Sequence, residues 1–198
     1  MMVMINKKNI KRQIRIAAIV ATGVDDLELI IPTDLWRRAR FIVDYISIEK
    51  KNSVTLAQGT SIKCSLTIDK SNLMQYNAIY LPGGLGSKRF GDDQKLTHYL
   101  SKFNEKDQTS PRYILAINES PIILKNLGLL EGKKVVASKE HKDAIGSNFD
   151  SKTNVLLSDN IITARATGHA IDFAIETVKI LASKKEADDL AKMISYER

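Results

Sequence analysis

Ala78-Ile79-Tyr80-Leu81-Pro82-Gly83-Gly84 passes from a short apolar run directly into a glycine loop. Such a run is typical of a strand that is buried on both faces, as in a parallel sheet. Residues 113–117 form a second apolar run, which passes into Asn118-Glu119-Ser120. Pro121 then favours the start of a helix that Gly128 would end. Two buried strands that each deliver a turn before a helix predict an α/β fold.

The beginning of the chain has the same order of strand, turn and helix. Residues 14–20 form a β-branched apolar run that ends in Ala21-Thr22-Gly23. Asp25 and Asp26 follow, where a helix N-terminus favours acceptors and negative charge. Apolar residues then recur at helical spacing, with arginines late in the segment. Because Pro32 lies inside this pattern, we expect a kink or an irregular first half of the helix.

The remaining pattern completes an alternation of strands and helices. We expect further strands at 41–48, at one or two places within 53–69, at 133–137, and in a hairpin of 155–158 with 161–164. Further helices are expected at 94–103, 170–181 and 186–196. This order predicts a mostly parallel sheet with helices on both faces. We expect a single domain over residues 1–198, with a basic N-terminal tail at 1–12.

Composition narrows the classes of function. The formal charge is +7, which could favour anionic partners, but acids are interspersed among the basic residues, so we expect no nucleic-acid partner. No apolar stretch approaches the roughly 20 residues of a membrane-spanning helix, and no signal-peptide pattern follows the tail. We therefore expect no membrane partner and place the protein in the cytoplasm. The single cysteine, Cys64, excludes an intrachain disulfide and a cysteine-based metal cluster; we expect no cofactor and no metal.

Ligands of open parallel sheets bind at the carboxyl ends of the strands, because loops and helix N-termini converge there. Three segments point to that edge: 25–28, 81–86 and 116–121. The glycine segment alone lacks the lysine of a phosphate-binding loop and the spacing of a dinucleotide fingerprint. Beside the turn at residue 118, however, its free N–H groups would form an oxyanion hole. The segments together predict a site at this edge.

Four separated segments resemble the ThiJ/PfpI family in order and spacing: 28–38, 81–84, 116–121 and 163–173. The resemblance extends from residue 14 to about residue 181 and implies a flavodoxin-like three-layer sandwich that forms a homodimer. Family members include glyoxalases, reported deglycases, chaperones, amidases or peptidases, and oxidative-stress sensors. Their usual apparatus is a cysteine at a strand-to-helix elbow, an acid from the first helix, backbone donors from the glycine loop and often a histidine. The resemblance assigns the acid to Glu28, the donors to Gly83 and Gly84, and the elbow to Asn118.

Asparagine at the elbow decides the functional expectation. The lone pair of its amide nitrogen is delocalised, so Asn118 cannot attack a carbonyl as a thiolate does, although it can donate and accept hydrogen bonds. Glu119 is larger and more acidic than the small residue that relatives usually place after the elbow. Lys139 aligns where many relatives have histidine, with His141 two residues on. We count Glu119 and Lys139 with the two glycines as ligand-binding candidates.

Other residues are weaker candidates for a nucleophile or its partner. We interpret Cys64 as a structural thiol, Ser120 as a helix-cap or core hydroxyl, His169 as a capping or surface residue and His98 as a surface residue. The leading hypothesis is a family member without cysteine chemistry whose pocket accepts a small carbonyl or carboxylate ligand. The alternatives are a glyoxalase-like or hydrolytic enzyme that uses Glu28 with water or Lys139 through a Schiff base, and a chaperone or stress-response protein.

Overall fold

The computed structural model describes residues 13–105 and 111–197, so the expected basic tail lies outside the described residues. Within these residues, seven strands form the main sheet in the order β5-β2-β1-β6-β7-β9-β8, and only β8 is antiparallel to its neighbour. The strands are β1 Arg15–Val20, β2 Ile42–Ser47, β5 Leu66–Thr67, β6 Ala78–Leu81, β7 Tyr113–Ile117, β8 Val155–Ser158 and β9 Ile161–Ala164. A separate antiparallel pair consists of β3 Ser53–Thr55 and β4 Ser61–Lys63.

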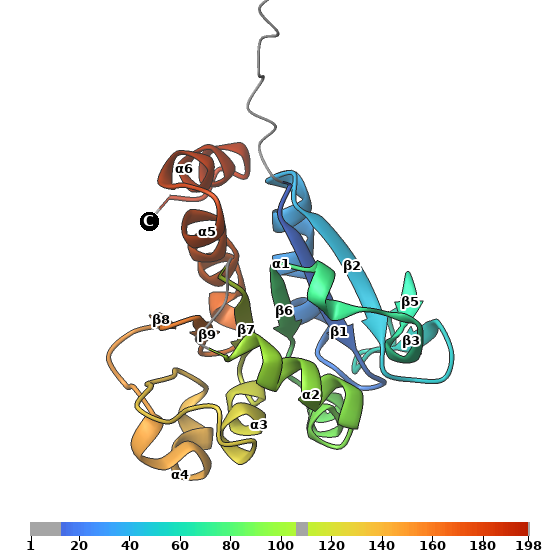
Figure 1. The fold of residues 1–198 in the computed structure, drawn as a ribbon. Coiled ribbons are helices and arrows are strands. Elements are labelled where there is room, and N and C mark those ends of the chain that lie inside the picture. Colours follow the sequence, from blue (N-terminus) through green and yellow to red (C-terminus); the bar gives the residue numbers. More distant parts are fainter. Residues whose placement is uncertain (1–12, 106–110, 198) are drawn as a thin grey trace, which may run out of the picture.

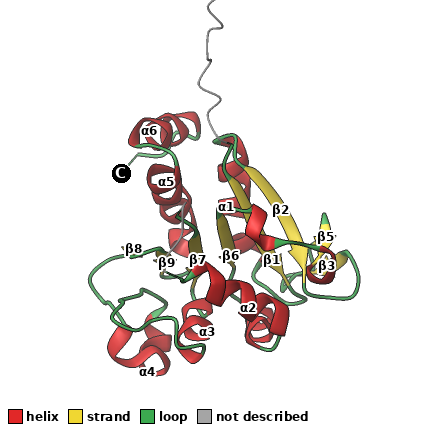
Figure 2. Cartoon of the chain, in the orientation of Figure 1, coloured by secondary structure: helices red, strands yellow, loops and turns green. Residues whose placement is uncertain are grey.

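Helices enclose this sheet on both faces (Figures 1 and 2). The order of strands explains why: β1 connects to β2 in one direction along the sheet and β6 connects to β7 in the other, so right-handed crossovers place their helices on opposite faces. The helices are α1 Asp26–Arg38, α2 Gln94–Phe103, α3 Ser120–Asn126, α4 Lys142–Ile145, α5 Ala170–Leu181 and α6 Lys184–Met193. The expected mostly parallel, flavodoxin-like three-layer sandwich is confirmed.

An aromatic cluster joins α1 and α5 to the centre of the sheet. Trp36 of α1, Tyr80 of β6 and Phe173 of α5 are fully buried, with ring centroids 4.9, 6.0 and 5.7 Å apart. The indole N–H of Trp36 donates to the carbonyl of Ala174 at 3.3 Å, so its polar atom is satisfied. This packing anchors α1, the helix that carries Glu28.

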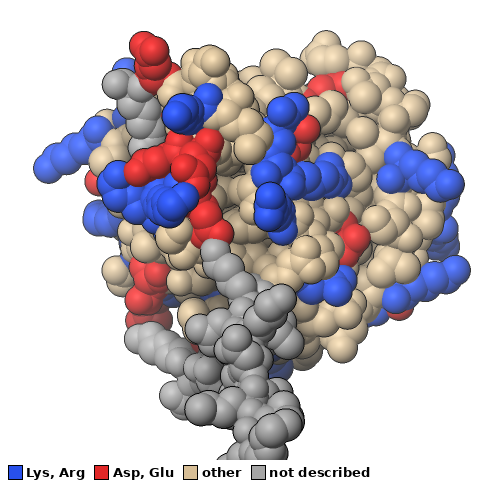
Figure 3. Space-filling model, turned by 90° about the horizontal axis from the view of Figure 1, so that it is seen from above, with Lys and Arg blue, Asp and Glu red and all other residues tan. Residues whose placement is uncertain are grey.

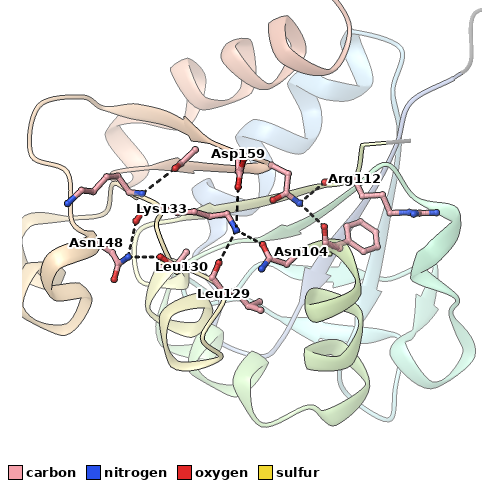
Figure 4. A network of polar contacts seen from close by, with 11 residues as sticks. Asn104, Arg112, Leu129, Leu130, Lys133, Asn148 and Asp159 are labelled. Atoms are coloured by element: carbon pink, nitrogen blue, oxygen red, sulfur yellow. Dashed lines mark hydrogen bonds and ion pairs between the residues drawn. The ribbon is translucent and has the colours of Figure 1, made fainter. Parts of the chain in front are cut away.

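The strand expected at 133–137 is wrong, because the N–H groups of this segment bond to loops and side chains. Only an isolated bridge joins Val135 to Phe149. The Val136 N–H donates to the hydroxyl of Thr163 at 3.0 Å, and the Lys134 N–H donates to that of Ser158 at 3.2 Å. Lys133 turns its side chain inward, into the polar network of Figure 4.

Two other expectations concern helices. The helix α1 continues through Pro32 from Asp26 to Arg38, so the expected irregularity does not interrupt it. The last helix begins at Lys184, two residues before the expected start. Its N-cap is Ser183, whose hydroxyl accepts from the Glu186 N–H at 3.2 Å, which leaves Glu186 inside the first turn.

The surface bears on the expected partners. On the face shown in Figure 3, lysines and arginines are scattered among acidic and uncharged residues. Among the described residues, no helix is long and apolar enough to cross a membrane.

The surface has several hollows of about 380 to 490 Å³. One of 470 Å³ lies between α1, α5 and α6, and its lining includes Ile31 and Leu35. Leu27 of α1 is 53% exposed. The homodimer stays a prediction, and light scattering would test it.

Candidate functional site

Glu28 lies in the first turn of α1 and is fully buried. Its N–H donates to the side chain of the N-cap residue Asp25 at 2.9 Å. Pro32, four residues on, has no N–H, so the Glu28 carbonyl lacks the usual helical donor. The hydroxyl of Tyr80 donates to that carbonyl instead. Proline and tyrosine together tie Glu28 to the central strand β6.

The Glu28 carboxylate receives hydrogen bonds from three other parts of the chain. Its Oε2 accepts from the Gly83 N–H at 3.0 Å. Its Oε1 accepts from the Asn118 Nδ2 at 3.0 Å and from the Thr167 hydroxyl at 2.9 Å. These donors follow β6, β7 and β9, so the carboxyl ends of three neighbouring parallel strands meet at Glu28.

Asn118 forms the turn between β7 and α3. Its φ is 60°, a left-handed conformation that asparagine tolerates better than most residues. The Asn118 N–H donates to the carbonyl of Ala164 at the end of β9, at 3.1 Å. Its side-chain Oδ1 is buried and has no hydrogen-bond partner among the described residues. A half-turn of the amide would present this acceptor to Glu28, so Asn118 can partner either protonation state of the acid.

Glu119 places a second carboxylate at the same glycine loop. Its Oε2 accepts from the Gly84 N–H at 2.8 Å. A Cβ atom at position 83 would collide with the carboxylates of both Glu28 and Glu119 and would lie 2.9 Å from the Cβ of Asn118. Only glycine therefore lets the three side chains converge. Both N–H groups expected to line an oxyanion hole, those of Gly83 and Gly84, are bonded to carboxylates of the chain itself.

Burial and neighbouring acids control the ionisation of Glu28. Burial raises its pKa to about 7, and the negative charges of Asp25 and Glu119 act in the same direction. The hydrogen bonds from Thr167 and from the Gly83 N–H stabilise the ionised form and lower the pKa in part. A carboxyl group with a pKa near neutrality can hold or release a proton under ordinary conditions.

The structure does not bring the remaining candidates to this cluster. Lys139 is exposed in a short 3₁₀ helix, Lys139–His141, and no hydrogen bond or ion pair among the described residues joins it to Glu28, Asn118 or Glu119. Cys64 is 2% exposed, and burial raises the pKa of its thiol to about 11. His98 is exposed on α2. Ser120 and His169 are close to the cluster in sequence, but their side chains face other partners. The Ser120 hydroxyl donates to the Pro82 carbonyl at 2.7 Å, and His169 lies 3.6 Å from the carboxylate of Asp172.

Thr167 and Tyr80 are members of the cluster that sequence reasoning missed. Thr167 follows β9 at its carboxyl end, so the rule that located the other segments could have included it. Tyr80 gave no signal of its own, because a tyrosine inside an apolar run is indistinguishable from any core residue. Among the described residues, no group of three or more histidine, cysteine, aspartate or glutamate side chains could hold a metal ion.

Comparison with known proteins identifies the family. The profile of the DJ-1/PfpI family matches residues 14–180. The chain belongs to the DJ-1/PfpI family. An uncharacterized protein of Mycoplasma pneumoniae is 30% identical over 188 residues, covering 93% of this chain and 90% of the relative. The protein dj-1beta of Drosophila melanogaster is 28% identical over 183 residues, covering 90% and 96%.

Solved structures of DJ-1/PfpI proteins share the fold. Oxidized DJ-1 of Toxoplasma gondii matches with a TM-score of 0.87 and 28% identity, covering 93% of this chain and all of that one. Drosophila melanogaster DJ-1beta matches with a TM-score of 0.86 and covers 94% of this chain; its 23% identity supports the fold alone. The resemblance to the ThiJ/PfpI family is thereby confirmed over nearly the whole chain.

Proposed function

We propose that this DJ-1/PfpI protein has no cysteine-dependent activity and keeps a site for a small carbonyl or carboxylate ligand at the carboxyl edge of its sheet. The observation that carries the proposal is the hydrogen bond between the Asn118 amide and Glu28 at a strand-to-helix turn with φ of 60°. We infer that Asn118 occupies the elbow where the family resemblance implies a cysteine.

The chemistry of Asn118 and of Cys64 supports the proposed lack of cysteine-dependent activity. The lone pair of an amide nitrogen is delocalised into the carbonyl and is not free for attack, whereas covalent catalysis requires a nucleophile. The single thiol, Cys64, does not replace it, because the thiol is buried and its pKa of about 11 leaves it protonated at neutral pH. The acid and the turn therefore persist without the group that would react.

One observation favours a second candidate function. Because the pKa of Glu28 is about 7, this residue could act as a general acid or base on a water molecule. Such a protein would be a hydrolase or a glyoxalase-like enzyme that forms no covalent intermediate. The two functions differ in whether replacing Glu28 abolishes a measurable turnover.

The test is lactate formation from methylglyoxal by the purified protein, beside Asn118→Cys and Cys64→Ala. We expect turnover well below the roughly 1 per second typical of enzymes in the unaltered protein and in Cys64→Ala, and a measurable gain in Asn118→Cys. Ordinary enzymatic turnover in the unaltered protein would sink the proposal. If that turnover survived Cys64→Ala but not Glu28→Gln, the water-based mechanism would replace it.

A further inference from the structure

We propose that the Glu119 carboxylate is a tethered occupant of the site, held on the Gly84 N–H where a small monocarboxylate such as acetate would otherwise bind. The inference rests on the proposed function and deepens it, because a site whose Gly84 donor is held by Glu119 excludes free monocarboxylates and leaves a small carbonyl compound as its ligand class. It makes Glu119 a specificity-determining residue.

The contacts of Glu119 are those expected of a bound anion. Its carboxylate accepts a hydrogen bond of 2.8 Å from the Gly84 N–H. Among the described residues, no ion pair joins it to a lysine, arginine or histidine, although such pairs occur elsewhere on the surface. Glu119 is half-buried, whereas the neighbouring Glu28 is fully buried. Glu119 is therefore the more exposed of the two acids, and its carboxylate holds the loop donor.

Without the Gly84 N–H, the negative charge of Glu28 would disfavour the Glu119 carboxylate at this position. The charge of Glu119 raises the pKa of Glu28, so the two carboxylates repel each other when both are ionised. A charge-assisted hydrogen bond from a backbone N–H offsets such repulsion. Glycine at position 83 is also required, because any side chain there would collide with both carboxylates. The loop therefore accommodates an anion next to Glu28, and the chain supplies that anion itself.

A tethered carboxylate excludes a free one by its effective concentration. Linking a ligand to its site makes its binding intramolecular, which a dissolved competitor matches only at millimolar levels or above. Glu119→Ala removes the atoms beyond Cβ, a methylene and a carboxylate, which together have the size of acetate. Acetate should therefore fill the vacated position and accept from the Gly84 N–H.

The experiment compares Glu119→Ala, the unaltered protein and Glu131→Ala in sodium acetate and in sodium chloride of equal ionic strength. Glu131 is exposed in a turn after α3 and serves as the matched control. Near pH 6, where Glu28 is mostly neutral, we expect acetate to raise the Tm of Glu119→Ala by about 2 to 4 °C when it exceeds its Kd about tenfold. The other two proteins should not respond beyond the chloride control. Bulky trimethylacetate should raise none of the three.

The NMR resonance of the Gly84 amide reports acetate binding at the hydrogen-bond donor itself. Glu119→Ala should shift it, and acetate should return it toward its position in the unaltered protein. If Glu119→Ala does not fold, Glu119→Gln keeps the size of the side chain, and acetate should then shift the Gly84 resonance by displacing a neutral amide. An equal acetate response in all three proteins, or a Gly84 resonance that acetate leaves unchanged in both variants, would overturn the inference. The methylglyoxal assay is independent of these readings, so a failure of the proposed function is distinguishable.

Discussion

Glu28 and Lys133 are both buried ionisable residues, but their surroundings differ in charge. Lys133 is 8% exposed, and its ammonium group donates to the Asn104 side-chain oxygen at 2.8 Å and to the Leu129 carbonyl at 3.3 Å. The carboxylate of Asp159 lies 3.8 Å away (Figure 4). All three partners are oxygen atoms, which carry negative charge or partial charge and stabilise a cation. The charged neighbours of Glu28, Asp25 and Glu119, are acids that disfavour its charge.

The two residues also lie at opposite ends of the strands. The network of Lys133 adjoins the beginnings of β7 and β9, where the Asn160 side chain donates to the carbonyls of Phe103 and Arg112 at 2.7 and 2.9 Å. The cluster around Glu28 lies at the carboxyl ends of β6, β7 and β9. Ligands of parallel sheets bind at carboxyl ends. We therefore interpret the Lys133 network as structural and the Glu28 cluster as a site with an unmatched charge.

The largest effect that tests this comparison should come from Lys133→Ala. The substitution leaves the oxygens of Asn104 and Leu129 without their donor and removes the packed aliphatic stem, so we expect a loss of about 4 kcal/mol in the free energy of unfolding. Urea denaturation measures it. Lys184→Ala is the control, because Lys184 forms an exposed pair with Asp188 and such pairs contribute about 1 kcal/mol or less. Similar losses in the two variants would contradict a structural role for Lys133.

The difference between the two regions also explains what the sequence could predict. The runs at 78–81 and 113–117 are strands at the predicted residues, because a strand buried on both faces leaves a continuous apolar pattern. Glu28 and Asn118 were recognised by resemblance. Thr167 meets Glu28 across 139 positions of sequence, so no local pattern encodes the contact, and only the convergence of strand ends, extended to β9, could have predicted it. The strand predicted at 133–137 failed because an apolar run does not reveal where its N–H groups bond.

A smaller effect should follow the ionisation of Glu28. Its folded-state pKa, about 7, is above the ordinary value of 4.5, so the folded protein binds the proton more tightly than the unfolded chain. This contribution to stability is fully present below about pH 4.5 and is lost as pH rises through 7. One pKa unit corresponds to about 1.4 kcal/mol, so the loss is on the order of 3 kcal/mol.

Glu28→Gln isolates this contribution from all other titrations. We expect the free energy of unfolding of the variant, relative to the unaltered protein, to increase by on the order of 3 kcal/mol between pH 5 and pH 8. Urea denaturation across this range measures the difference. A difference that is independent of pH would show that Glu28 ionises as an ordinary surface carboxyl and would remove the contrast with Lys133.

The smallest effect should come from Thr167→Val, which keeps the shape of the side chain and removes its hydroxyl. That hydroxyl donates to Glu28 at 2.9 Å, and of the contacts that lower the pKa of Glu28 it has the largest effect. Without it the pKa should rise further above 7. The ionised carboxylate loses a donor while the neutral acid loses less, so the variant should be destabilised by about 1 kcal/mol above pH 8 and by less at pH 5. Thr153→Val is the control, because Thr153 is exposed. NMR titration of the Glu28 carboxyl carbon in both variants measures the pKa directly. A pKa that falls, or that changes equally in the control, would mean that Thr167 does not stabilise the ionised form, and the cluster would then extend over β6 and β7 but not β9.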